Sequence, residues 1–425
     1  MDIQPVNPSE RNLGGVDYFL LWAGVAISLA EIWAGGFLAP MGFWMGFLAI
    51  ILGHIIGNTF MAMGGIMGSD HGIMAMVSVR PSFGIRGSNL AAVLNIIQLI
   101  GWASIMLIIG GRAGATLGES AGGILALSQF WIVIIGLGTL IWALCTGKSA
   151  WKIMQTTAVI ALLLVIMAMT GVSFREFGSE VLAVKPKGMH FMTGLDLVIA
   201  MPISWLPVVA DYSRFSKRTM PAFWNTWWGY FIVSCWMYVL GLTATLVTGE
   251  TDPGMLILDL MGKIGFAVPA LIMVVFSTIT SDFPDVYSAT CSMMNISEKI
   301  SAKAFMWIVG IFSILVALVF PMDHYENFLL FIGAMFVPLF GVVLTDYFLI
   351  RRRRLNLEEI YKVGGEYWYY KGFNIRALAS WAVGFVVFEF IAIMEYPVGA
   401  SIPSMAVSGV LYFILAKGER EKISV

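Results

Sequence analysis

Long apolar runs recur along the whole chain and are separated by short polar segments. Each run is long enough to cross about 30 Å of hydrocarbon as an α-helix. Because the connections are short, we expect no attached soluble domain. The pattern predicts an all-α integral membrane protein with twelve transmembrane helices, at residues 17–39, 43–67, 88–116, 124–145, 151–173, 193–213, 220–248, 263–293, 303–321, 325–350, 374–395 and 400–417.

Composition agrees with a membrane protein. The chain is 59% hydrophobic and 12% charged, whereas about 25% of the residues of a soluble domain are charged. No basic patch large enough for nucleic acid is present. The three cysteines have no motif spacing, which excludes a disulfide framework or a cysteine metal site. The polar segment 1–17 lacks the apolar core of a signal peptide.

The distribution of Lys and Arg predicts cytoplasmic N- and C-termini in the inner (plasma) membrane, because basic residues concentrate in cytoplasmic loops. In that orientation twenty basic residues lie inside and five lie outside. The inside residues are Arg11, Arg80, Arg86, Lys148, Lys152, Arg214, Lys217, Arg218, Lys299, Lys303, Arg351 to Arg354, Lys362, Lys371, Arg376, Lys417, Arg420 and Lys422, and the outside residues are Arg112, Arg175, Lys185, Lys187 and Lys263.

Two polar segments, 174–192 and 351–371, divide the predicted spans into groups of five, five and two. An odd number of spans per group inverts the second group relative to the first. Inverted five-span repeats are a known plan of secondary transporters, with the binding site at mid-membrane between the repeats. The predicted units are a cytoplasmic tail at 1–16, a first repeat at 17–173, an inverted second repeat at 193–350 and two peripheral helices at 374–417.

This plan predicts that the first helix of each repeat is interrupted. The first span carries Gly35 and Gly36, and the sixth span carries Pro202 and Pro207. Proline removes a backbone donor and clashes with the preceding turn. Such residues also merely kink membrane helices, but paired interruptions at corresponding positions favour a binding site.

Glu31 lies past the middle of the first span, shortly before Gly35. A carboxylate at bilayer depth is costly, so it faces a cavity or a partner and is a candidate functional residue. The alternative is a carboxylate that pairs with a neighbouring helix for packing only.

The eighth span places four hydroxyls and two carboxylates within Ser277 to Asp285. Hydroxyl oxygens suit a hard cation such as sodium, and Thr280 and Ser281 are adjacent. Asp282 and Asp285 are three residues apart and share a helix face. Hydroxyls that bond back to the preceding turn are the alternative, which leaves the two carboxylates unexplained.

Gln98 and Trp102 are four residues apart in the third span and share a face, so a flat heterocycle could stack on the indole while the amide reads its edge. Trp33 and Trp205 lie at the predicted helix breaks, the latter beside Ser204. Most of the fifteen tryptophans are expected to be packing residues or interface anchors.

Other classes of function find no support in the sequence. There is no Walker motif, nucleophile elbow or HExxH motif, and the four histidines lack metal-ligand spacing. We therefore expect neither an enzyme nor an ATP-driven pump. Broken helices with a stacking tryptophan favour a closed site over a channel. His54 in the second span is either a proton relay or a buried polar residue whose hydrogen bonds are satisfied by its neighbours.

The chain resembles the nucleobase:cation symporter-1 family, and within it the cytosine permease and hydroxymethylpyrimidine permease branch. The resemblance runs from about Val16 to Arg354. It is carried by Ile32-Trp33-Ala34-Gly35-Gly36, Arg80-Pro81-Ser82-Phe83-Gly84-Ile85-Arg86-Gly87-Ser88, Gln98 to Trp102, Ala210-Asp211-Tyr212-Ser213-Arg214-Phe215, Asn295-Ile296 and Gly341-Val342-Val343-Leu344-Thr345-Asp346-Tyr347.

The resemblance implies a LeuT-like (APC) fold, with a ten-helix inverted-repeat core and two peripheral helices. Family members take up nucleobases or related flat heterocycles, often with sodium and sometimes with protons. It implies that sodium is the coupling ion and no other cofactor is needed. The implied sodium ligands are backbone groups near Ala30 to Ala34, with Ala30 and Trp33 as the named positions, and the hydroxyls of Thr280 and Ser281.

The resemblance also implies that Trp102 stacks on the substrate ring with Gln98 beside it. In the family, an aromatic residue of span six covers the other face of the ring. Counting back from Asp211 without a gap reaches Pro202, which cannot stack in this way, so Trp205 is the nearest substitute. The other implied partners are a small heterocycle and the lipid bilayer, with no nucleic acid.

Three acids depart from the family pattern. Asp282 and Asp285 occupy a stretch where the family usually has Asn, and Glu31 replaces an uncharged residue. Carboxylates accept hydrogen bonds from amines and protonated ring nitrogens. We therefore expect import of an amino-pyrimidine. The substrate we favour is 4-amino-5-hydroxymethyl-2-methylpyrimidine, in preference to uracil or allantoin. Cytosine or a purine is the alternative, with sodium or with protons carried by Glu31 or Asp282.

Overall fold

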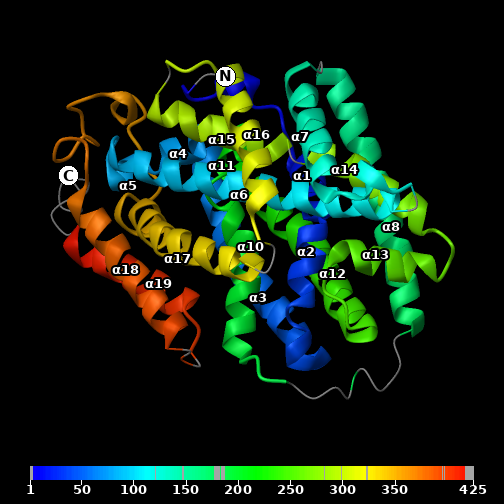
Figure 1. The fold of residues 1–425 in the computed structure, drawn as a ribbon. Coiled ribbons are helices and arrows are strands. Elements are labelled where there is room, and N and C mark those ends of the chain that lie inside the picture. The colour runs from blue at the N-terminus through cyan, green and yellow to red at the C-terminus, as the bar shows by residue number, and fades with distance from the viewer. Residues whose placement is uncertain are drawn as a thin grey trace.

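The computed structural model describes residues 3–119, 121–145, 148–176, 182, 187–281, 283–297, 299–321, 324–394, 396 and 398–416. These residues form helices and connecting segments, and the only strand-like features among them are two isolated bridges. Seven of the described helices are long and apolar enough to cross a membrane, and four shorter apolar helices accompany them. Figure 1 shows the resulting helical bundle.

Each predicted span falls on one helix or on a consecutive pair. In chain order they are α1 (Gly15–Ala26) with α2 (Leu29–Gly36), α3 (Gly42–His71), α6 (Gly87–Gly118), α7 (Ser128–Cys145), α8 (Lys148–Glu176), α10 (Phe191–Trp205) with α11 (Val209–Ser213), α12 (Thr219–Thr248), α14 (Ala267–Ser281) with α15 (Phe283–Ile296), α16 (Ala302–Val319), α17 (Tyr325–Leu344) with the π-helical η5 (Thr345–Ile350), α18 (Ile375–Ile393) and α19 (Ser401–Leu415).

Shorter helices occupy several connections. Two of them, α4 (Ala75–Ser78) and α5 (Arg80–Phe83), lie between α3 and α6. The helix α13 (Pro253–Gly262) follows α12 and has no counterpart in the predicted spans. Asp252 caps its N-terminus by accepting from the backbone N–H groups of Gly254 and Met255.

The first predicted interruption lies before Glu31 rather than at the two glycines after it. Ile27 and Ser28 leave the helical conformation, and Ser28 is extended at φ −138° and ψ 139°. The Ser28 hydroxyl accepts from the Ala30 N–H at 3.2 Å and so caps α2. Glu31 therefore lies in the first turn of α2, where the helix dipole favours a carboxylate.

Gly35 and Gly36 serve a different purpose from the one predicted, namely the close approach of α2 to α12. A Cβ at Gly35 would collide with the carbonyl oxygen of Tyr238, and one at Gly241 would collide with the carbonyl oxygen of Ile32. Small residues at a helix contact let two backbones pack closely in a membrane. Tight packing of α2 on α12 fixes the direction in which Glu31 points.

The second predicted interruption is confirmed. The helix α10 ends at Trp205 and α11 begins at Val209, with Pro207 in the turn between them. Pro202 lies inside α10 and does not end it. Backbone carbonyls near Ser204 are therefore released from the helical ladder at this break.

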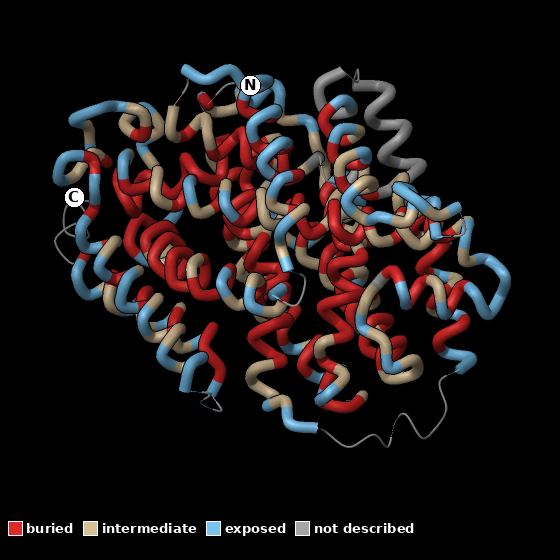
Figure 2. The backbone as a smooth tube through the Cα atoms, in the orientation of Figure 1, coloured by how far each residue is buried: buried red, intermediate tan, exposed pale blue. Residues whose placement is uncertain are grey.

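Burial separates a central set of helices from peripheral ones (Figure 2). We compare the most apolar stretch of each segment. In α10 with α11, 83% of its residues are buried, and in α17 with η5 the share is 72%, whereas in α18 it is only 22%. With α19, α18 packs beside α17 at one side of the bundle (Figure 1). The prediction of two peripheral helices after the ten-helix core is therefore confirmed.

Candidate substrate and ion site

Gln98 on α6 is joined to the break between α10 and α11. Its Nε2 donates to the backbone carbonyl of Ser204 at 2.9 Å and to Asn95 Oδ1 at 2.8 Å. Both partners accept, so they fix the orientation of the amide. Its other atom, Oε1, is buried and has no hydrogen-bond partner. Gln98 of the third span is therefore tied to the second break, and one of its acceptor atoms has no partner.

Trp102 lies one turn further along α6 and is 8% exposed. Its ring packs edge-on against Tyr325, with centroids 6.0 Å apart, and against Phe328 at 5.4 Å. The indole Nε1 is buried without a hydrogen-bond partner. A buried N–H without a partner costs about 1–3 kcal/mol, and an acceptor on a bound molecule would remove this penalty.

Tyr325 connects this aromatic group to α2. Its hydroxyl donates to the carbonyl of Ala30 at 3.0 Å, and its ring lies 5.2 Å from that of Trp33. Ala30 and Trp33 both lie inside α2, two or more residues after the break. The backbone of the interruption itself belongs to Ile27 and Ser28.

Glu31 points at α12. Its Oε1 accepts from the Tyr230 hydroxyl at 2.6 Å, while its Oε2 is buried without a hydrogen-bond partner. The Tyr230 oxygen in turn accepts from Trp205 Nε1 at 3.1 Å. Glu31 is thereby linked to the second break through Tyr230, on the side of α2 that packs on α12.

His54 on α3 completes a polar cluster on this side. Its Nε2 lies 2.6 Å from Ser234 Oγ, and its Nδ1 lies 2.8 Å from the carbonyl of Ile50. The ring stands edge-on to Tyr238 at 4.9 Å, and the Tyr238 hydroxyl is buried without a partner. We call Glu31, His54, Tyr230, Ser234 and Tyr238 the acid cluster.

The sequence analysis missed the α12 members of this cluster. Tyr230, Ser234 and Tyr238 are four residues apart and therefore line one helix face. That spacing of polar residues inside an apolar span was the available signal.

The remaining predicted site residues stand as follows. The Ser204 hydroxyl bonds to Met201 of its own helix, so Ser204 reaches the site through its carbonyl. Asp285 is buried in the first turn of α15, within electrostatic reach of Tyr212. Thr280 and Ser281 belong to α14, but their side chains lie outside the described residues, and so does Asp282 altogether.

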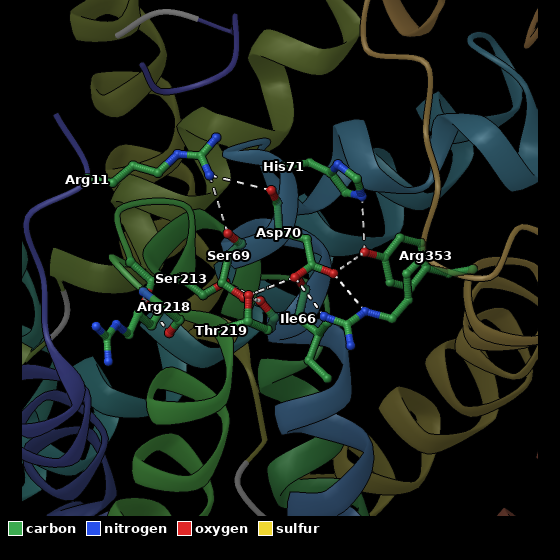
Figure 3. A network of polar contacts seen from close by, with 12 residues as sticks. Arg11, Ile66, Ser69, Asp70, His71, Ser213, Arg218, Thr219 and Arg353 are labelled. Carbon is green, nitrogen blue, oxygen red and sulfur yellow. Dashed lines mark hydrogen bonds and ion pairs between the residues drawn. The ribbon is translucent and has the colours of Figure 1, made fainter. Parts of the chain in front are cut away.

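A second polar network closes one end of the bundle (Figure 3). Asp70 lies next to the end of α3. Its carboxylate accepts from the hydroxyls of Thr219 and Tyr347, each at 2.7 Å, and from Nε and Nη2 of Arg353. The hydrogen bonds to Asp70 raise the pKa of Arg353. Nearby, Arg11 donates to the carbonyls of Ser69 and Asp70. We call the residues bonded to the Asp70 side chain the Asp70 network.

Comparison with known proteins decides the family. A family model described as permease for cytosine/purines, uracil, thiamine, allantoin matches residues 5–414. The chain belongs to this family. It is therefore a membrane permease and not an enzyme, as the sequence predicted.

Curated members of the permease family are similar over most of the chain. The purine-uracil permease of Arabidopsis thaliana is 24% identical, with 91% of this chain and 70% of that protein aligned. The hydantoin permease of Microbacterium maritypicum is 25% identical over 74% of this chain and 68% of its own length. The cytosine permease of Escherichia coli K12 is 24% identical over 66% of this chain and 65% of its own length.

Solved structures establish the fold. Mhp1, a nucleobase-cation-symport-1 family transporter in a closed conformation with bromovinylhydantoin bound, superposes with a TM-score of 0.85 at 22% identity, covering 99% of this chain and 95% of Mhp1. A Na+-coupled sialic acid symporter gives a TM-score of 0.57 at 14% identity, covering 97% and 93%. The predicted LeuT-like architecture is confirmed.

Proposed function

We propose that this permease imports an amino-pyrimidine across the cell's inner membrane by cation-coupled alternating access. The substrate we favour is 4-amino-5-hydroxymethyl-2-methylpyrimidine, and cytosine or a purine is the alternative. The substrate would lie between α6 and the break of α10 and α11, at Gln98 and Trp102.

The observation that carries the proposal is a pair of buried polar atoms without partners. Gln98 Oε1 is an acceptor and Trp102 Nε1 is a donor, and they lie one helical turn apart on α6. An exocyclic amine would donate to the amide oxygen, and a ring nitrogen or hydroxyl would accept from the indole. Uracil carries a carbonyl where an amino-pyrimidine carries the amine, so it would meet the amide oxygen with an acceptor.

Acidic residues add to this preference. Glu31 keeps Oε2 free while Tyr230 occupies Oε1. Direct contacts of the substrate with Glu31, Asp282, Asp285, Ser204 or Trp205 stay predictions, and so does a stack on Trp33. Of these, Trp205 has its indole nitrogen bonded to Tyr230 and its ring edge-on to Trp22 at 5.7 Å.

Sodium is the coupling ion that the family resemblance favours, with Ala30, Trp33, Thr280 and Ser281 as its proposed ligands. The interruption of the first helix at Ile27 and Ser28 supports this assignment. An ion that orders the first break would raise substrate affinity, and the substrate would raise ion affinity by the same factor. A proton is the second candidate because of the acid cluster.

Orientation rests on the basic residues. The N-terminal segment contacts the end of α3 through Arg11, and Arg80 bonds to Asn295 at the end of α15 and to Ile360. These contacts hold two of the predicted inside residues, Arg11 and Arg80, at the end of the bundle that we propose is cytoplasmic.

One binding experiment tests the proposal. Purified protein is incubated with radiolabelled hydroxymethylpyrimidine, cytosine, uracil and hypoxanthine, each in sodium and in choline. We expect the two amino-pyrimidines to bind more tightly than uracil, and sodium to strengthen binding. Stronger binding of uracil would contradict the amino-group argument, and equal binding in both salts would remove sodium coupling.

A further inference from the structure

The acid cluster has a proton arrangement that its hydrogen bonds determine. The carbonyl of Ile50 can only accept, so His54 Nδ1 carries a hydrogen. In the neutral ring Nε2 is then bare, and it accepts the Ser234 hydroxyl hydrogen at 2.6 Å. Ser234 has no second hydrogen to offer, so its oxygen can only accept from any further neighbour.

The same reasoning applies on the other side of Glu31. Trp205 Nε1 can only donate, so the Tyr230 oxygen accepts from it and turns its own hydrogen to Glu31 Oε1. The carboxyl thus receives one hydrogen bond, at Oε1. Its Oε2 has none, although the Ser234 hydroxyl lies close enough to interact with the carboxyl.

No cation compensates this carboxyl among the described residues. The groups facing it are Tyr230, Ser234, Cys235 and Tyr238 on α12, Tyr325 on α17, and His54 on α3 behind Ser234. Arg112 on α6 reaches α2 only over the Trp33 ring, 6.0 Å from its centroid, and is paired with Asp252. Trp205 on α10 adds no charge.

A buried carboxylate without a cation is expensive, because desolvation of a charge costs several kcal/mol. One neutral donor and the dipole at the start of α2 return less than this. A proton on Oε2 removes the charge and supplies the hydrogen that Ser234 can accept. We propose that the carboxyl of Glu31 is a proton-binding site, closed by Tyr230 and Ser234, and that this proton is a coupling ion of transport. The coupling half rests on the proposed function, whereas proton binding does not.

The contacts show how proton binding would act on the transport site. Neutral Glu31 permits the close packing of α2 on α12 that Gly35 and Gly241 provide. Loss of the proton places an unpaired charge at this contact, which favours its opening to water. Through Tyr230 and Trp205 the change reaches the second break, where the Ser204 carbonyl holds Gln98.

Infrared difference spectra of the purified, substrate-free protein between acid and alkaline pH test proton binding directly. We expect a carbonyl-stretch band of a protonated carboxylic acid that disappears at alkaline pH. Glu31→Gln should abolish this band, whereas Glu326→Gln, at the partly exposed start of α17, should retain it. Spectra of Glu31→Gln identical to those of the unaltered protein would overturn the proposal.

A second variant covers the case in which Glu31→Gln fails to fold. Ser234→Ala removes the proposed acceptor of the proton but keeps the carboxyl. It should retain the band and shift the pH at which the band disappears to lower values, because the protonated form loses its hydrogen bond. An unchanged midpoint would show that Ser234 does not bind this proton, and no band at all in the unaltered protein would overturn the site.

Uptake into proteoliposomes tests the coupling half. An inward proton gradient without sodium should drive uptake of the heterocycle that binds best, and Glu31→Gln should lose the difference between uptake with the gradient and uptake without it. Gradient-driven uptake retained in Glu31→Gln would overturn the coupling. If no heterocycle binds to any variant, the proposed function fails, and the infrared result stands by itself.

Discussion

Arg353 forms a two-pronged ion pair with Asp70 across 283 residues of chain. Its Nε lies 2.9 Å from Asp70 Oδ2 and an Nη lies 2.8 Å from Oδ1. Arg353 adopts a left-handed backbone conformation at φ 64°, just after η5, and this places its side chain over the end of α3. The pair joins the first repeat to the end of the second.

We predict that Arg353→Lys weakens this connection, because a lysine ammonium cannot make the paired contacts of a guanidinium. The affected end is the proposed cytoplasmic one, so its opening should become more frequent. The measurement is backbone hydrogen exchange at the end of α3 and at the start of α12, which should become faster in Arg353→Lys. This method leaves Thr219, which also bonds to Asp70, unaltered.

The control for this prediction is Arg352→Lys. Arg352 is the exposed neighbour of Arg353, so its substitution keeps the charge and leaves the Asp70 network intact. Equal exchange rates in the two variants would show that the ion pair does not hold this end closed.

Trp102→Ala should abolish heterocycle binding without loss of folding. The indole supplies both a stacking face and the unpartnered Nε1 donor, and stacking alone is worth roughly 0.5–1.5 kcal/mol beyond burial. The measurement is substrate binding together with the melting temperature. Trp224→Ala is the matched control, since Trp224 lies on α12 with 53% of its surface exposed. Unchanged affinity in Trp102→Ala would place the stack elsewhere.

Gln98→Leu should weaken binding of amino-pyrimidines more than binding of uracil. It removes the acceptor proposed for the amine and leaves the Ser204 carbonyl and Asn95 Oδ1 without their donor. Loss of one such buried hydrogen bond costs about 1–3 kcal/mol, or roughly five- to 150-fold in affinity. Competition binding with the two ligand classes measures the difference. An equal loss for both would indicate a packing role for Gln98.

Ser28→Ala should destabilise the start of α2 by about 1 kcal/mol, the usual worth of an N-cap side chain. Ser28→Asn is the control, because asparagine caps equally well. The expected result is a lower melting temperature in Ser28→Ala and a nearly unchanged one in Ser28→Asn. A lower melting temperature in both variants would mean that the size of the side chain at position 28 matters more than its capping bond, since the Ser28 hydroxyl also lies 4.0 Å from the sulfur of Met106.

Much of the architecture follows from the sequence for a simple reason. In lipid, a spanning segment must satisfy its own backbone hydrogen bonds, which an α-helix does, so a long apolar run indicates a helix with few alternatives. The number of spans was predicted on that basis. The two peripheral helices followed from the grouping of the spans by polar segments, and the break near Pro207 followed from the prolines and the two-repeat plan. The joining of Gln98 to the second break was not predicted, because it depends on a contact between two helices that are far apart in the sequence.

The position of the first break was not predictable from glycines alone. Gly35 and Gly36 indicate either an unwound segment or a close helix contact, and the local sequence is the same in both cases. The partner that distinguishes the two is Gly241, which lies about 200 residues away on α12. The direction of Glu31 could not be predicted for the same reason, because a helix face becomes meaningful only when its neighbour is known. The Asp70 network depends likewise on contacts between the two repeats.

The contact of α2 with α12 yields the last prediction. Gly241→Ala should destabilise the protein by roughly 1–3 kcal/mol, because the added methyl group would collide with the Ile32 carbonyl and approach Gly36 N at 3.1 Å. Gly171→Ala is the matched control. It lies in α8 with no atom within 4 Å of the added carbon, so alanine there should be neutral or stabilise the helix by about 0.5–1 kcal/mol. Melting temperatures in the same detergent would separate the two, and equal values would show that α2 can move away from α12 without penalty.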